Sequence, residues 1–187
     1  MGWATRLRPR RDLIVPTLAI ASPAVWFVLR ELTSSLRFEA ITAAYLGRYG
    51  VLTGGALLGS YLVAALVAPR VRTRAWTDHP IAAVVLAPSN ATLAVLGFLL
   101  GGVVVYFLGP DVVPIPEPID RLAVPIGLVM ALPLLVSMIV TYALMDGAGP
   151  LRWVGIALFS VGVSLSVLWT TILAGAVANL VAAPSTQ

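Results

Sequence analysis

The sequence contains no cysteine and no lysine, only one histidine, and few charged residues of either sign. Without cysteine the chain can form no disulfide, iron–sulfur cluster or thiolate metal site. Without lysine it can form no Schiff base with a cofactor and has no phosphate-binding Walker lysine. The single His79 has no second histidine to complete a metal shell. We therefore assign no catalytic residue, no metal site and no cofactor.

The scarcity of charge also sets the class of protein. Charged residues make up 11% of the chain and hydrophobic residues 59%, and the mean hydropathy is +0.97. A soluble globule of 187 residues needs far more polar surface than this. The composition predicts an all-α integral membrane protein, a helical bundle forming one transmembrane domain over residues 1–187. The net charge of +4 does not indicate nucleic-acid binding, because the arginines lie beside apolar segments.

The apolar runs predict about five transmembrane helices. The longest, from Ile81 to Leu108, has no charged residue and would extend about 42 Å as one helix, which exceeds a bilayer core. Arginines precede this run and acidic residues follow it, so we expect the N-terminus on the inner side of the cell membrane and the C-terminus on the outer side. The expected spans cover residues 13–29, 49–68, 81–108 with a break near 88, 122–144 and 151–181. The first could alternatively be a signal peptide.

Residues 30–48 differ from the spans on either side of them. Leu32, Leu36, Ile41 and Tyr45 recur at intervals of three to five residues among charged side chains. This pattern is typical of an amphipathic helix at the membrane surface. We therefore expect an interfacial helix between the first and second spans.

Two prolines inside the expected spans indicate candidate binding or gating positions. Pro88 should break the third span, and Ser89 or Asn90 should cap the helix that follows. Broken helices bind solutes in many transporters, although a plain kink explains the same residues. Pro133 should kink the fourth span, and Ser137 and Thr141 share its face and could bond the carbonyls that the kink frees.

An arginine cluster follows the second span and gives a candidate anionic-lipid contact. Arg70, Arg72, Arg74 and Trp76 combine guanidinium groups with an indole, which suits phosphate head groups at an inner leaflet. The alternative is that these arginines only fix the orientation of the chain.

Small residues four or seven positions apart are typical of close contacts between transmembrane helices. We expect three of these pairs to mark packing faces: Gly55 with Gly59, Gly97 with Gly101, and Gly155 with Gly162.

The expected spans carry no charged residue except Arg152 at the start of the last one. Buried acid–base relays and intramembrane catalytic sites need such residues. We therefore expect a non-enzymatic small membrane subunit, scaffold or accessory protein that acts through helix packing and contact with the lipid bilayer. Its expected partner is another membrane protein or a second copy. The alternative is a small transporter or channel for a neutral or weakly polar solute that uses the broken third helix.

Overall fold

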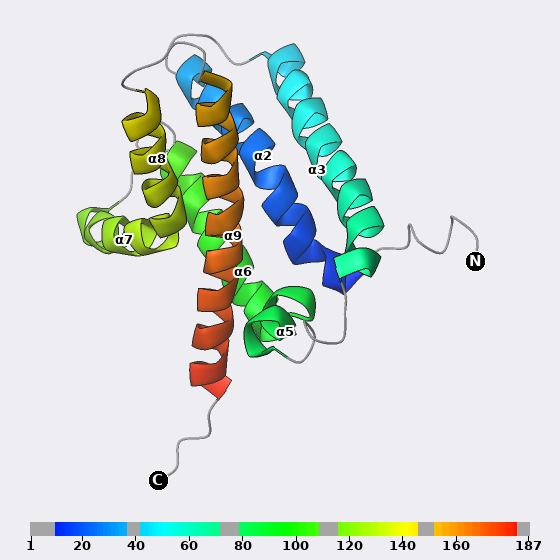
Figure 1. Ribbon diagram of the computed structural model, residues 1–187. Coiled ribbons are helices and arrows are strands. Elements are labelled where there is room, and N and C mark those ends of the chain that lie inside the picture. The colour runs from blue at the N-terminus through cyan, green and yellow to red at the C-terminus, as the bar shows by residue number, and fades with distance from the viewer. Residues whose placement is uncertain (1–9, 37–41, 72–78, 109–115, 146–151, 183–187) are drawn as a thin grey trace.

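The computed structural model describes residues 10–36, 42–71, 79–108, 116–145 and 152–182, and every element within these ranges is helical (Figure 1). In chain order the elements are η1 (Arg11–Leu13), α2 (Ile14–Leu36), α3 (Ala43–Val71), α5 (Pro80–Leu86), α6 (Asn90–Leu108), α7 (Glu117–Met130), α8 (Leu132–Met145) and α9 (Arg152–Ala182).

Helix α9 is the axis of the bundle and packs against α2, α5, α6 and α8. The buried core cluster contains Val15 of α2, Leu96 of α6 and Ala174 of α9. At the other end of α2, the rings of Trp26 and Phe27 lie 6.1 and 6.0 Å from the ring of Phe159, near the start of α9. Helices α2 and α9 are therefore antiparallel, and the start of α2 and the end of α9 lie at the same end of the bundle (Figure 1).

Several helices are long and apolar enough to cross a membrane, which agrees with the expected helical membrane protein. Among the described residues three helices meet this condition: Arg11–Ser35, Ala43–Val67 and Trp153–Ala182. The bent pair α7 and α8 would make a fourth span if it crosses as one unit. The five expected spans are therefore not confirmed. The run from Ile81 to Leu108 is divided into α5 and α6 at residues 87–89, where Pro88 predicted a break.

The segment 30–48 does not form a separate helix within its described part. Residues 30–36 continue α2, where the hydroxyls of Thr33 and Ser34 donate to the carbonyl oxygens of Arg30 and Glu31. Helix α3 begins at Ala43, because the hydroxyl of Thr42 accepts a hydrogen bond from the N–H of Tyr45. Amphipathic spacing alone could not show that the two flanking helices extend into this segment, and the expected interfacial helix is not confirmed. Residues 37–41 lie outside the described ranges.

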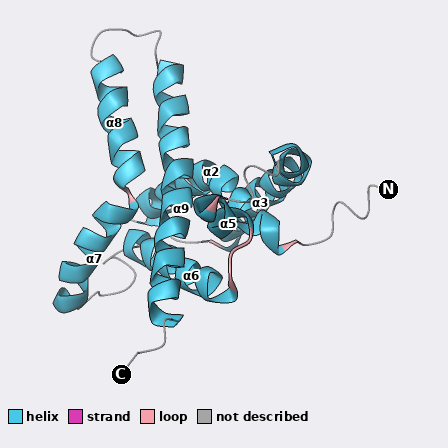
Figure 2. Cartoon of the chain, turned by 60° about the horizontal axis from the view of Figure 1, so that its bottom comes forward, coloured by secondary structure: helices cyan, strands magenta, loops and turns pink. Residues whose placement is uncertain are grey.

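The expected fourth span is two helices rather than one kinked helix. Helices α7 and α8 meet at Ala131 and are bent by 66° with respect to one another (Figure 2). The start of α8 contacts the middle of α9 near Ser166, and α8 then runs antiparallel to α9 toward the start of that helix. The bent pair therefore accompanies only the first half of α9.

The contact between α8 and α9 depends on the absence of a side chain at Gly162. A Cβ atom added there would lie 2.6 Å from the Cβ of Ser137 and 3.3 Å from the Cα of Leu134. We expect Gly162→Ala to lower the free energy of unfolding by about 1–3 kcal/mol through this overpacking. The control is Gly101→Ala, where an added Cβ meets nothing within 4 Å. Thermal unfolding in detergent measures both, and equal stability of the two variants would contradict the close contact.

Candidate functional site

The break between α5 and α6 is closed by hydrogen bonds of its own residues. Pro88 is buried, and Ser89 caps α6 by accepting a hydrogen bond from the N–H of Thr92 at 3.0 Å. The hydroxyls of Ser89 and Thr92 are also bonded at 2.9 Å, and Thr92 is buried. Ser89, rather than Asn90, therefore caps this helix, and the N–H of Thr92 already has its hydrogen-bond acceptor.

Asn90 bonds to a residue from the other end of the sequence. The Nη1 atom of Arg11 donates to its Oδ1 atom at 2.9 Å, which joins η1 to the start of α6. The sequence analysis assigned no role to Arg11. The signal that could have found this bond is an unpaired polar side chain at each helix start, but only the packing shows that these two starts are neighbours.

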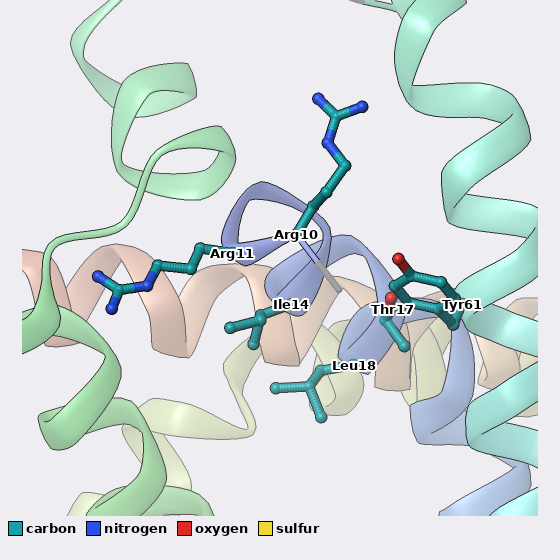
Figure 3. A pocket seen from close by; sticks show the side chains of 6 residues that line it. All are labelled: Arg10, Arg11, Ile14, Thr17, Leu18 and Tyr61. Atoms are coloured by element: carbon teal, nitrogen blue, oxygen red, sulfur yellow. The ribbon is translucent and has the colours of Figure 1, made fainter. Parts of the chain in front are cut away.

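A pocket of about 470 Å³ lies beside this bond, between the start of α2 and α3. Its lining consists of two cations, two aliphatic side chains and two hydroxyl-bearing side chains: Arg10, Arg11, Ile14, Leu18, Thr17 and Tyr61. Figure 3 shows the guanidinium groups of Arg10 and Arg11 extending in different directions, with Thr17 and Tyr61 on the side opposite Arg11. In this pocket two cations adjoin an apolar wall.

The polar side chains that line this pocket differ in whether they have a hydrogen-bond partner. Arg10 forms a two-point ion pair with Asp12, with nitrogen–oxygen distances of 3.2 and 2.9 Å. The hydroxyl of Thr17 is buried and finds no hydrogen-bond partner among the described residues. A buried hydroxyl without a partner lowers stability by about 1–3 kcal/mol. Such a group in a pocket wall suits a ligand that supplies the missing hydrogen bond.

The break between α7 and α8 is held by side chains of α9. Pro133 has no N–H, so the carbonyl of Val129, four residues earlier, loses its helical partner. The Nε1 atom of Trp169 donates to this carbonyl at 2.9 Å, and the hydroxyl of Ser166 accepts from the N–H of Leu134 at 3.1 Å. Trp169 and Ser166 thus replace the bonds that the break removes.

Ser137 and Thr141 do not take the role that the sequence suggested for them. The hydroxyl of Ser137 donates to the carbonyl of Leu134 at 2.8 Å, within its own helix. The hydroxyl of Thr141 is buried without a partner in the described part of the chain. Sequence reasoning missed Trp169 and Ser166 because they lie on another helix.

The expected lipid contact after α3 is mostly outside the described residues. Arg70 lies in the last turn of α3, and Arg72, Arg74 and Trp76 follow it beyond the described range. The end of α3 and the start of α2 lie at the same end of the bundle (Figure 1).

The expected packing glycines fall into two groups. Gly162 lies against Ser137 of α8, and Gly155 is also buried. A Cβ atom added at any of the other four would meet nothing within 4 Å: Gly55, Gly59, Gly97 and Gly101. Sequence reasoning missed Gly175, where an added Cβ would lie 2.6 Å from Cγ1 of Val84 in α5.

Comparison of the chain with protein-family models, with curated proteins and with solved structures found no match. The described residues contain no group of three or more histidine, aspartate or glutamate side chains arranged to hold a metal ion. The function is therefore argued from the geometry of the breaks, the pocket and the exposed helix faces.

The bond from Trp169 to Val129 provides a test of how the second break is held. We expect Trp169→Phe to lower the free energy of unfolding by about 1 kcal/mol, because the ring remains but the donor is lost. In a Pro133→Ala background the new N–H can bond to Val129, so the same change should cost less. Trp153→Phe is the control, because Trp153 is 78% exposed. Equal costs of Trp169→Phe in both backgrounds would contradict this account of the break.

Proposed function

We propose that the chain is a non-enzymatic multi-pass protein of the cell membrane that acts by contact, as a small subunit or accessory protein for another membrane protein. The observation that carries this proposal is the glycine face of α3. Helix α3 packs mainly against α2 and η1, through a side that contains the buried residues Tyr49, Ser60 and Ala64.

Gly55 and Gly59 lie on the opposite side of α3. At about 100° per residue they share a face with Val51, Leu58 and Leu62, all of which are exposed. Both glycines are themselves exposed, and an added Cβ meets nothing within 4 Å at either one. The glycine face, defined as Val51, Gly55, Leu58, Gly59 and Leu62, is therefore open in the described part of the chain.

The glycine face favours a helix as its neighbour over lipid alone. Each glycine within a helix costs roughly 0.5–1 kcal/mol relative to alanine, and contact with lipid chains does not offset that cost. A neighbouring transmembrane helix does, because small residues allow two backbones to approach closely. The partner we propose is accordingly a transmembrane helix of another membrane protein.

The two breaks support a structural role for their residues rather than transport. A solute site in the first break would need polar groups that remain available to the solute. Ser89 already caps α6, and Asn90 already accepts from Arg11. At the second break, Trp169 and Ser166 bond the backbone groups near Pro133. The transporter alternative therefore gains no specific support.

We also propose that both ends of the chain face the cytoplasm, in place of the N-inside, C-outside orientation expected from five spans. The start of α2 and the end of α9 share one end of the bundle, which supports an even number of crossings. More arginines adjoin this end in the sequence, namely Arg6, Arg8, Arg10, Arg11, Arg70, Arg72 and Arg74, than the opposite end, namely Arg30, Arg37, Arg48 and Arg152. Positive charge favours the cytoplasmic side.

Single cysteines test this orientation cleanly, because the chain has none of its own. We expect a cysteine at Ala43, the exposed start of α3, to react with an impermeant maleimide on intact cells. Cysteines at Thr73 and Ser185 should react only after the membrane is permeabilised. Labelling of Ser185 from outside would instead support an odd number of crossings.

Replacement of the two glycines tests the proposed partner contact. We expect the double variant Gly55→Leu and Gly59→Leu to lose a protein that co-purifies in fixed stoichiometry with the wild-type chain from native membranes in mild detergent. The leucine side chains prevent the close approach of a second backbone. The matched control is Gly50→Leu with Gly54→Leu, because both glycines are also open and four residues apart but lie about 140° from Gly55 and Gly59 around the axis of α3.

Retention of the partner by the Gly55 and Gly59 variant would contradict the proposed contact. Purification of the wild-type chain alone, or only with copies of itself, would contradict the accessory role.

A further inference from the structure

The charges beside the pocket leave one cation without a carboxylate. Arg10 and Asp12 form an ion pair, whereas Arg11 forms none with a described carboxylate and bonds instead to the neutral side chain of Asn90. Arg10, Arg11 and Asp12 together carry a net charge of +1. A guanidinium has five N–H donors, and the bond to Asn90 uses one of them, so Arg11 is held in place with donors to spare.

The remaining wall of the pocket suits an amphiphile rather than a small ion. Ile14 and Leu18 lie one helical turn apart on α2 and form an apolar strip beside the two arginines. Tyr61 of α3 faces this part of the pocket, and the buried hydroxyl of Thr17 lies beside the strip with its hydrogen bond unmade among the described residues. A volume of about 470 Å³ is within the usual range for ligand pockets and far exceeds the needs of one phosphate ion.

We infer that the pocket lined by Arg10, Arg11, Ile14, Thr17, Leu18 and Tyr61 binds an anionic phospholipid. The phosphodiester oxygens accept hydrogen bonds from the guanidinium of Arg11. The upper part of an acyl chain lies along Ile14 and Leu18, and a glycerol or ester oxygen accepts a hydrogen bond from the hydroxyl of Thr17. This inference rests on the proposed placement in a membrane, and it is independent of any partner on α3.

Free phosphate offers the same anion but not the same fit. It would satisfy Arg11 and leave Ile14 and Leu18 in contact with water, whereas a lipid covers both and gains the free energy of apolar burial. A zwitterionic lipid brings a cationic group close to Arg10 and Arg11, which lowers its affinity relative to a lipid whose head group carries only the phosphate charge.

Native mass spectrometry of the purified full-length chain tests the inference. The protein is titrated in detergent with phosphatidylglycerol, with phosphatidylcholine, and with glycerol phosphate as the soluble form of the same anion. We expect one phosphatidylglycerol molecule to bind at least about tenfold more tightly than phosphatidylcholine, because the choline group of phosphatidylcholine brings a like charge close to Arg10 and Arg11. Glycerol phosphate should not displace the lipid at equal concentration. Equal affinity for the two lipids, or displacement by glycerol phosphate, would overturn the lipid assignment.

Variants then locate the bound lipid. Arg11→Gln should weaken phosphatidylglycerol binding about tenfold by removing one charge-assisted interaction. Leu18→Trp should weaken it by filling the pocket while all charges remain. Arg48→Gln is the matched control, because Arg48 is exposed near the start of α3, at the opposite end of the bundle.

A second control separates loss of binding from loss of folding. Asn90→Ala removes the hydrogen bond between Asn90 and Arg11 but keeps the cation. Its lipid affinity should fall by no more than about twofold, which is much less than the loss expected when a charge-assisted bond is removed. Unchanged binding by both Arg11→Gln and Leu18→Trp would overturn the pocket as the site. A loss of lipid binding by Asn90→Ala as large as that of Arg11→Gln would assign Arg11 to the fold rather than to the lipid.

Discussion

Every backbone N–H and C=O group in an apolar environment needs a partner within the protein, and this constraint governs the bundle. The chain has few polar side chains that could bond to unpaired backbone groups, and its helices are interrupted at two prolines, Pro88 and Pro133. Several side-chain hydrogen bonds lie at those interruptions. Ser89 caps α6, while Trp169 and Ser166 bond to the backbone at the second break. The breaks are therefore fixed points of the fold rather than openings in it.

The same positions determine how closely the helices pack. Gly162 and Ser166 lie one turn apart on α9, and both face the first turns of α8. The absence of a side chain at Gly162 brings the α8 backbone near enough for Ser166 to reach the N–H of Leu134. Gly175 similarly admits Val84 of α5 to the other half of α9. One long helix can thus hold two short ones, because it supplies small residues and hydroxyls at the same contacts.

Hydropathy was sufficient to predict an all-helical chain with several membrane-compatible helices, and the chemistry of Pro88 located the first break. Hydropathy could not determine the number of membrane crossings. Residues 122–144 contain no charged residue, so a kinked span and two helices bent by 66° have the same composition. The difference arises from Trp169 and Ser166, which are distant in sequence. The bond between Arg11 and Asn90 was hidden for the same reason, since neither residue carries a pattern that identifies the other.

The pocket and the glycine face are both features of α3, but they do not compete for the same side of it. Tyr61 follows Gly55 by six residues, which places the two about 120° apart around the helix axis. A helix packed on Gly55 and Gly59 would therefore leave the side bearing Tyr61 turned toward the start of α2. A lipid bound there would lie beside the partner helix instead of beneath it. Because η1 and α2 form the other wall of the pocket, such a lipid would stiffen the α2 and α3 pair, and that rigidity would in turn present the glycine face in one orientation.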